Sequence, residues 1–545
     1  MVASLLLTTS LLASAAVITT PQAPQIEVLV EVGRRLEGGG VVRRVRGVDM
    51  DRSGNWGAVV DVERHGGQVE SVVLENGNVL FSQGDVLPNG DRVAAIDSIR
   101  MGLDTGPLVK YLVPAPAPAP ATAFVGRLVD GNGVLLSDGQ VLDLVNHGPG
   151  TRLVRLLSFD GAVDRLLVTA QIEVPGEMPL EAALRFRIED GHLRDGEVVA
   201  NQGSNVSALQ HLIDEFLPPL AIAANGSHAV SFRLANGSEE AVAGLFDQAP
   251  AFEAGTMAPQ NVGSWECITP RVACSGAGHF VVGGTVRSGT ARGIVANSNE
   301  VLALDGAPLP AAPSERVGAF LETEVAVTDT GEALFGVPLE AGGEVLVLGE
   351  RLLLRTGVSS VDGRVIRSLR SSGHGALAVS PTGDRVIVKV ELEAGIEALL
   401  SLQPSVGYEE PCGATANSVG LVGSLVALGS DVVSVNALRL RAAHLPPSTF
   451  GLVLTSRTPG SITNPGGSAG TLCLGGAIGR VLPGVQASPV GDLEVPMDLS
   501  SIALPGGPVA AGPGETWRFQ LWYRDVDPSG IVTSNLTGSV RVELR

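Results

Sequence analysis

One short stretch has the spacing of a nucleophilic serine motif. Gly466, Ser468 and Gly470 match the pattern G-x-S-x-G. In hydrolases that use this motif, the serine sits on a strand-to-helix turn with a histidine and a carboxylate in reach. Here the stretch is rich in glycine and proline, a predicted strand follows it, and His444 is the one histidine of the C-terminal region. We therefore predict a loop, and the sequence assigns no catalytic residue.

Two acidic stretches resemble the first half of a calcium-binding loop. Asp49 and Asp51 alternate as the early ligands of such a loop do, but Val60 stands where the closing glutamate belongs. Asp525 and Asp527 form a second pair of this kind. Aspartates also cap turns by accepting backbone hydrogen bonds, and we predict that role for both pairs. Calcium stays an alternative, and we expect no other cofactor.

The histidines do not form a recognisable metal or catalytic motif. No two have H-x-H, H-x-x-x-H or H-E-x-x-H spacing, so we predict no metal site. Two of them follow copies of the turn described below and could converge, although surface positions are expected. Carboxylates from distant parts of the chain could also meet, as in glycoside hydrolysis, but no local pattern indicates them. The histidines are His65, His147, His192, His211, His228, His279, His374 and His444, of which His228 and His279 follow the turns.

Four cysteines are present: Cys267, Cys274, Cys412 and Cys473. An even number of cysteines in an exported chain suggests disulfides, and four cysteines allow three pairings. Proximity in the sequence and the domain division below favour the pairs Cys267–Cys274 and Cys412–Cys473. Zinc is disfavoured because the spacings are not C-x-x-C.

The N-terminal residues predict export. Residues 1–16 form an apolar run in which Ala13 and Ala15 give the small-x-small pattern of a signal peptidase site, although no Lys or Arg precedes it. The run is too short to span a membrane, and no other segment of membrane length follows. The formal charge of −20 disfavours nucleic acid as a partner. We therefore expect a protein that is secreted, periplasmic or on the cell surface, without a membrane span.

A turn of the form small-polar residue, glycine, then alternating β-formers recurs along the chain. Its copies lie about 50 to 65 residues apart. The copies begin and end at Asp51 and Gly54, Asp104 and Gly106, Asp160 and Gly161, Asn225 and Gly226, Ser275 and Gly276, Asp329 and Gly331, and Ser380 and Gly383. The longest interval contains residues 206–217, whose apolar spacing predicts an amphipathic helix that ends at two prolines.

A period near 50 residues with about four strands per repeat is typical of a β-propeller. We predict an all-β chain in which residues 25–405 form a propeller of about seven blades, with six or eight as alternatives. The last repeat lacks its second half, and residues 25–47 have the pattern of that half. We expect them to pair with residues 385–402, so that strands from both ends of the domain close the ring.

The repeat resembles the degenerate N-x-x-G-x-x-A-F tandem repeats of secreted planctomycete-type proteins. Asp51 with Gly54, and Ser380 with Gly383, carry this resemblance, while Val or Leu stands where the family prefers Ala-Phe. The resemblance covers most of residues 25–405. It implies a repeat architecture and export, and no activity.

Residues 411–545 form a separate module with alternating strands and no helix pattern, which predicts a β-sandwich of two packed sheets. The residues that carry a resemblance in this module include Cys412, Asn417, Gly420, Leu445, Gly470, Cys473, Gly479, Trp517 and Asp525. Through them, the module resembles one that recurs at the C-terminus of many exported planctomycete-type proteins. That resemblance implies a role in attachment, sorting or spacing.

These features predict a noncatalytic exported protein that binds or scaffolds an unknown ligand outside the cell or in its envelope, as a monomer. The alternative is a propeller enzyme, a polysaccharide lyase or a glycosidase, with a carboxylate or histidine site at the central channel. A deep pocket with paired carboxylates would favour the enzyme, and a funnel of backbone and small side chains would favour binding.

Overall fold

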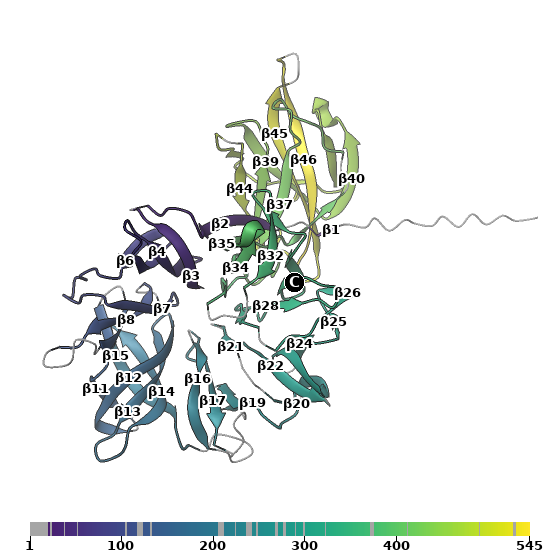
Figure 1. The fold of residues 1–545 in the computed structure, drawn as a ribbon. Coiled ribbons are helices and arrows are strands. Elements are labelled where there is room, and N and C mark those ends of the chain that lie inside the picture. The colour runs from purple at the N-terminus through teal and green to yellow at the C-terminus, as the bar shows by residue number, and fades with distance from the viewer. Residues whose placement is uncertain are drawn as a thin grey trace, which may run out of the picture. The chain divides into compact units, whose positions relative to one another are not determined.

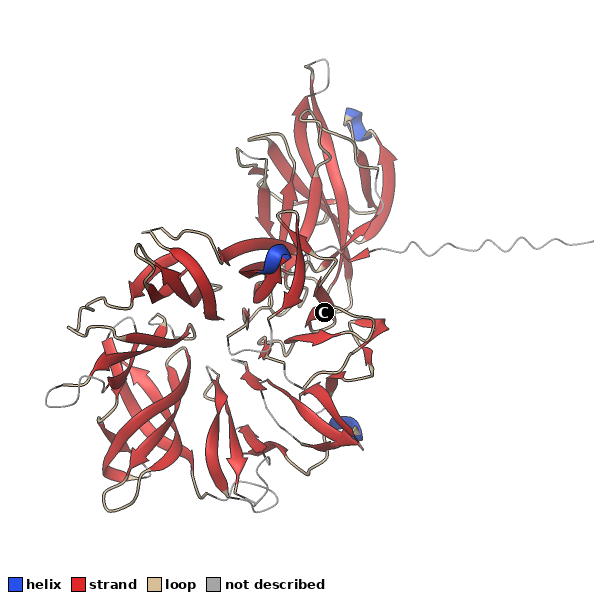
Figure 2. Cartoon of the chain, in the orientation of Figure 1, coloured by secondary structure: helices blue, strands red, loops and turns tan. Residues whose placement is uncertain are grey.

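The structure is a computed structural model that describes residues 20–545 with short gaps. The gaps are residues 22–23, 38, 52, 104–105, 117–123, 131–132, 146, 205–211, 224, 236–241, 247–248, 267–270, 276–278, 289, 298–299, 322, 371–374, 411–412, 490 and 527–529. The described chain is β-structured apart from three single 3-10 turns, η1 (Pro259–Asn261), η2 (Glu393–Gly395) and η3 (Pro465–Gly467), which confirms the all-β prediction (Figure 2). The predicted signal peptide lies outside the described residues.

The chain divides into two compact units, which we call the N-terminal unit (Pro24–Pro404) and the C-terminal unit (Ser405–Arg545 with β1, Thr20–Pro21). The N-terminal unit contains a series of small sheets in chain order (Figure 1). Their neighbouring strands pair antiparallel, except that the third sheet closes into a barrel through a parallel pairing of Leu144 with Gly196. The first three sheets are β3 (Val41–Met50), β4 (Trp56–Glu63), β5 (Val69–Glu75) and β6 (Asn78–Ser82); β7 (Ala95–Arg100), β8 (Leu108–Pro114), β9 (Phe124–Asp130) and β10 (Gly133–Ser137); and β11 (Val141–Leu144), β12 (Gly148–Ala162), β13 (Arg165–Glu173), β14 (Leu180–Glu189) and β15 (His192–Asn201).

The remaining sheets of this unit follow the same order. They are β16 (Ile213–Ile222), β17 (His228–Leu234), β18 (Val242–Phe246) and β19 (Ala249–Glu253); β20 (Ser264–Trp265), β21 (Arg271–Cys274), β22 (Phe280–Ser288), β23 (Thr290–Ala296) and β24 (Val301–Leu304), then the hairpin β25 (Pro308–Leu309) and β26 (Ala312–Arg316); β27 (Val325–Val327), β28 (Ala333–Pro338), β29 (Glu344–Leu348) and β30 (Arg351–Arg355); and β31 (Ser360–Val361), β32 (Arg364–Leu369), β33 (Leu377–Val379), β34 (Val386–Leu392) and β35 (Ile396–Gln403) with β2 (Gln25–Glu31).

Six of the seven recurring turns of the sequence lie between two consecutive strands of one sheet. These strands are β3 and β4, β7 and β8, β16 and β17, β21 and β22, β27 and β28, and β33 and β34. In the first copy, Asp51 Oδ1 accepts the backbone N–H groups of Ser53 and Asn55, both at 2.8 Å, and Gly54 has a φ of +81°. This is the capping turn expected there. One copy is displaced: Asp160 and Gly161 lie within β12, because the strand continues to Ala162 before it turns.

Apolar side chains fill the space between each sheet and the next. On β4, Ala58, Val60 and Val62 pack toward the last sheet and β3, whereas Val59 packs toward the sheet of β7. Because successive side chains of a strand point to opposite faces, β4 packs against the sheets on both sides of it. Similar clusters join the other successive sheets, so each sheet is buried on two faces.

The last sheet takes its outer strand from the N-terminal end of the unit. β2 pairs antiparallel with β35, with Gln25 opposite Gln403 and Glu31 opposite Ala398. The predicted pairing segment was too long, since residues 41–47 belong to β3 of the first sheet. Val30 packs with residues of both the first and the last sheet.

One strand of each sheet, which we call its inner strand, also contacts the inner strands of the neighbouring sheets. β3 contacts β7 on one side and β33 on the other, and contacts link β12, β16, β21, β27 and β33 in succession. Leu103, after β7, forms a bridge with Val163, after β12. Figure 2 shows these sheets following one another about a common centre.

The predicted helix at residues 206–217 can be compared with the structure only in its second half, because residues 205–211 lie outside the described chain. In that half the prediction is wrong. Ile213 begins β16, which pairs with β17. The register shifts twice along this pair, so apolar residues at helical spacing still face one side of a strand. Pro218 and Pro219 lie at the second of these shifts, between Leu217 and Ala221. Proline has no N–H to donate, so the backbone hydrogen bonds between β16 and β17 are interrupted there.

The C-terminal unit consists of strands only, apart from η3, in its described part. One sheet has the order β1, β36 (Gly407–Glu410), β46 (Val532–Glu543), β45 (Thr516–Val526), β39 (Phe450–Ser456) and β42 (Gly479–Arg480), with β43 (Val485–Gln486) also on β39. A second comprises β37 (Ser424–Gly429), β38 (Leu438–Ala443) and β44 (Leu493–Pro496), and a hairpin comprises β40 (Thr458–Thr463) and β41 (Thr471–Gly475). Trp517, Phe519 and Leu521 of β45 share one apolar core with Leu425 of β37 and Leu440 of β38.

Candidate functional site

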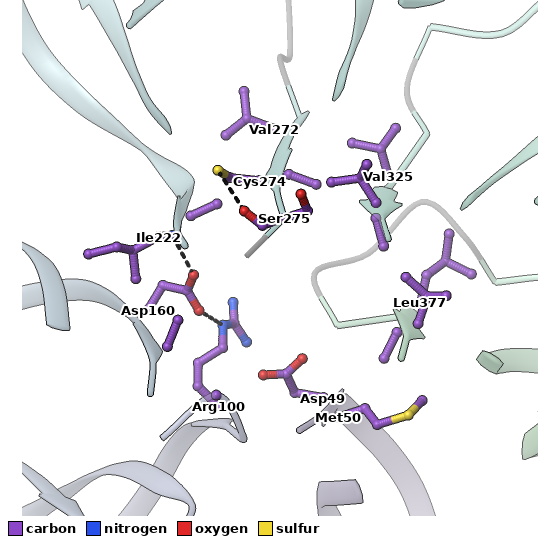
Figure 3. Close-up of a pocket in the computed structure, with 18 of the residues that line it drawn as sticks. Asp49, Met50, Arg100, Asp160, Ile222, Val272, Cys274, Ser275, Val325 and Leu377 are labelled. Atoms are coloured by element: carbon purple, nitrogen blue, oxygen red, sulfur yellow. Dashed lines mark hydrogen bonds and ion pairs between the residues drawn. The ribbon is translucent and has the colours of Figure 1, made fainter. Parts of the chain in front are cut away.

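A pocket, which we call the central pocket, lies where the inner strands of the N-terminal sheets meet. It has a volume of about 210 Å³ and is lined by residues from β3, β7, β12, β16, β21, β27 and β33. Asp49, Arg100 and Asp160 extend into the same space in Figure 3. The other charged residues of the lining are Arg271, Glu324 and Asp329, and much of the remaining wall is glycine, alanine and valine.

Each of three pocket carboxylates accepts a backbone hydrogen bond from the following sheet. Asp49 Oδ2 accepts the N–H of Met101 at 2.8 Å. Asp160 Oδ2 accepts the N–H of Ile222 on β16, also at 2.8 Å. These bonds join the inner strand of one sheet to the inner strand of the next.

Glu324 makes the third of these connections with both of its oxygens. Oε1 accepts the N–H of Gly375 at 2.7 Å, and Oε2 accepts the N–H of Ala376 at 2.6 Å. Both donors lie just before β33 in the last sheet. Glu324 therefore joins two sheets through two hydrogen bonds to backbone N–H groups, one at each carboxylate oxygen.

Arg100 is the counterion that these carboxylates share. Its Nε lies 3.5 Å from Asp160 Oδ1, and its side chain is 24% exposed. Its positive charge also opposes the rise in the pKa of Asp49, Asp160 and Glu324. Arg100 also lines two further cavities that share Asp97 and Ser98, and the second of them reaches β12 and β16.

Burial raises the pKa of three carboxylates of this pocket. Burial raises the pKa of Asp160 to about 7, with Arg100 opposing the rise and Asp49 adding to it. Burial also raises the pKa of Glu324 to about 7, against the two backbone N–H groups that favour the charged form. The pKa of Asp49 is raised for the same reason. Loss of hydration penalises the ionised form, and these partners offset only part of the penalty.

Backbone hydrogen bonds already occupy one or both oxygens of each of these three carboxylates. A general acid with a pKa near 7 is useful, but it must reach the substrate with its proton. Here carboxylate oxygens already meet backbone donors. The volume also falls below the roughly 300–1,000 Å³ of most small-molecule sites. No aromatic side chain lines the described pocket wall that could stack on a sugar ring.

Comparisons with known proteins leave the chain without an assigned family. No protein-family model and no curated protein sequence matches it. Among solved structures, it is similar to a putative oxidoreductase (glucose dehydrogenase) from Thermus thermophilus, at 11% identity and a TM-score of 0.26, over 70% of this chain and all of that one. It is also similar to an α-L-arabinanase from Penicillium chrysogenum, at 15% identity and a TM-score of 0.24, over 59% of this chain and 91% of that one. Such scores assign neither fold nor activity.

Asp49 and Asp51 have different hydrogen-bond partners. Asp49 bonds to Met101 in the pocket, whereas Asp51 caps its own turn and also accepts a bond from Asn55 Nδ2 at 2.8 Å. Among the described residues, no group of three or more His, Cys, Asp or Glu could hold a metal ion. Asp525 accepts the N–H of Ser418 at 3.1 Å, and its predicted companion Asp527 lies outside the described residues.

The two histidines that follow the turns have different surroundings. His228 is buried, with Nδ1 3.2 Å from the carbonyl oxygen of Gly226 and 3.4 Å from Arg185 of the preceding sheet. His279 lies against Gly331 in the turn of the following sheet. Neither lines the central pocket, and His211 and His374 lie outside the described residues.

Ser468 is not placed as a nucleophile. It is buried, and its Oγ donates to the carbonyl oxygen of Ser534 at 2.9 Å. The next element is β41, a strand, whereas the motif's chemistry needs a helix.

The cysteine pairs stay predictions, because Cys267 and Cys412 lie outside the described residues. Cys274 is half-buried in β21, and Cys473 is buried in β41. A side chain on Gly413, next to Cys412, would lie 3.3 Å from Thr471 Oγ1 in β41. The segment after Cys412 therefore runs beside the strand that carries Cys473.

Among the described residues, no helix is long and apolar enough to cross a membrane.

The sequence did not single out four residues of the charged pocket for chemistry. Arg100 and Arg271 each stand four residues before a recurring turn, at Asp104 and Ser275. Aligning the repeats on their turns could therefore have placed both arginines at one inner position. Asp160 and Glu324 occupy other offsets, so no local pattern pointed to them.

Proposed function

We propose that the N-terminal unit is a closed propeller of seven blades and that the C-terminal unit is a β-sandwich. The continuous series of apolar clusters between successive sheets supports the ring, including the cluster that joins the last sheet to the first. The β2–β35 pairing supports closure by a strand from the opposite end of the unit. The shared core of the two C-terminal sheets supports the sandwich.

We further propose that this is a noncatalytic binding or scaffold protein that acts outside the cell. One observation carries the proposal: Asp49, Asp160 and Glu324 are each hydrogen-bonded to the backbone of the next sheet. Residues in that role connect blades, and moving them to serve a substrate would break the connection. Binding then takes place on outer surfaces of the ring, and the C-terminal unit serves attachment or sorting.

A glycosidase or lyase is the second candidate. The observation that favours it is the pKa of about 7 at Asp160 and Glu324, which suits a general acid at neutral pH. In that case Asp160 would donate the proton, and Asp49 would be the second carboxylate.

The two candidates are separated by assaying the full chain and Asp160→Asn on neutral and acidic polysaccharides from pH 5 to 8. We measure new reducing ends and unsaturated products, and in parallel the cosedimentation of protein with insoluble cell-envelope polysaccharide. The binding proposal predicts no product from either protein and equal cosedimentation of both. Product formed by the wild type and lost in Asp160→Asn would establish the enzyme instead.

Export and attachment have their own test. Fractionation of the native host should place the tagged full chain at the cell surface or in the periplasm. A chain without residues 411–545 should move to the medium or the soluble periplasmic fraction. An unchanged distribution would contradict the attachment role.

A further inference from the structure

A second cavity lies on the outer part of the first sheet, away from the central pocket. Its volume is about 660 Å³, within the range of ligand sites. Two turns form it: the one that joins β2 to β3 and the one that joins β4 to β5. Arg35, Arg43, Arg64 and His65 line it together with Glu63 and five small or apolar residues.

The cavity is a positive site on a strongly negative protein. Three arginines lie beside two glutamates, Glu63 in the lining and Glu70 next to Arg64, whereas the whole chain carries a formal charge of −20. Arg43 adds to this because β3 has a bulge, where the register shifts between Val42 and Arg44. Val42 and Val45 stay buried on either side, and both Arg43 and Arg44 are exposed. A regular strand would have turned one of the two arginines toward the core.

Two of the arginines are already held in place. Arg43 pairs with Glu63 across the β3–β4 ladder. Arg64 Nε lies 2.5 Å from Glu70 Oε1, and its guanidinium also bonds the carbonyl oxygen of Gly39 in the opposite turn. A ligand that bound here would therefore order fewer side chains than it would on a surface of free arginines.

Glycines keep the cavity open. A side chain added at Gly39 or Gly66 would meet nothing within 4 Å, and both residues have positive φ angles of +89° and +95°. Their backbone can therefore approach a ligand closely. Arg35, on the same turn as Gly39, is exposed.

We propose that this cavity binds an anionic polysaccharide through its sulfate or carboxylate groups. Guanidinium groups match the geometry of both groups with paired hydrogen bonds. The described lining has no Phe, Tyr or Trp on which a nucleobase could stack, which favours a polysaccharide over single-stranded nucleic acid. This ligand class goes beyond the proposed function, and the site is separate from the carboxylates of the central pocket.

The test measures binding of the full chain to dextran sulfate and to polygalacturonate, with a single-stranded polynucleotide alongside. Arg35→Ser/Arg43→Ser removes two of the three cavity arginines. Arg155→Ser/Arg194→Ser is the matched control, because it removes the same charge at two exposed positions on β12 and β15. Arg35→Ser alone, in an exposed turn, serves if the double variant does not fold.

The proposal predicts that Arg35→Ser/Arg43→Ser raises the Kd for a polysaccharide at least about tenfold, and that the control changes it less than about twofold. Stronger binding of dextran sulfate or of polygalacturonate tells whether sulfate or carboxylate is preferred. Equal losses in both variants would show nonspecific charge attraction and overturn the site. Tighter binding to the polynucleotide, or no binding by the wild type at 0.15 M salt, would overturn the ligand class.

Discussion

The buried carboxylates of the central pocket show how single residues connect the sheets of this unit. Removing a carboxylate from water is costly unless donors replace the lost hydration. Asp160 and Glu324 obtain those donors from the backbone of the following sheet, and Arg100 supplies the charge. The pKa of both acids stays raised, so the compensation is incomplete.

Stability should therefore depend on pH through these two groups. Each has a pKa near 4 in the unfolded chain and about 7 in the folded one. Between those values the folded protein holds protons that the unfolded chain releases, so the free energy of unfolding falls as pH rises through this interval. Asp160→Asn should reduce the difference between pH 5 and pH 8 by roughly 1–3 kcal/mol, as measured by urea denaturation.

The exposed Glu350→Gln is the control for this prediction, because it removes one carboxylate outside the pocket. It should leave the difference between the two pH values unchanged. An equal pH dependence in wild type and Asp160→Asn would show that Asp160 does not hold its proton in the folded state.

At the residue scale, the sequence could predict what a turn needs but not what a ring brings together. Asp51 and Gly54 predict their turn because the residues that Asp51 bonds lie within four positions of it in the sequence. Asp160 and Ile222 lie 62 residues apart, and Asp49 and Met101 lie 52 apart. Contacts of this range depend on how sheets pack, which no local pattern records.

At the element scale, β16 illustrates a limit of periodicity. Bulges give this strand the apolar spacing of a helix, so the pattern fits both structures. The hairpin at Asn76 and Gly77 is the opposite case. The pair predicts a two-residue turn, and it joins Glu75 of β5 to Asn78 of β6 with φ angles of 48° and 85°.

A disulfide between Cys412 and Cys473 is the prediction for the C-terminal unit. It would tie the start of this unit to β41, whose Cys473 N–H already donates to Gln520 of β45 at 2.9 Å. Closing a loop of about 60 residues should stabilise the unit by about 4 kcal/mol. Mass spectrometry of an unreduced digest should yield the linked peptides from protein exported by its native host. Free thiols at both positions would refute the bond.

At the scale of the whole molecule, the N-terminal unit depends on repeated packing between neighbours. Among its described residues, separate apolar clusters follow one another from sheet to sheet. In a closed ring, disrupting the cluster between the first and last sheets exposes both of those sheets. In an open row of sheets, a change in β2 would affect only the end of the row.

The most direct test of closure is hydrogen exchange in the full chain with Val30→Asp. Val30 is 3% exposed, and it packs in the cluster shared by the first and last sheets. A charge there should cost about 3 kcal/mol. Glu27→Lys, at an exposed position of the same strand, is the control.

If β2 closes the ring, Val30→Asp should speed amide exchange about 100-fold in β3, β4, β34 and β35 together, and Glu27→Lys should leave it unchanged. Faster exchange confined to β2, with β3 and β35 still protected as in the wild type, would contradict a closed ring.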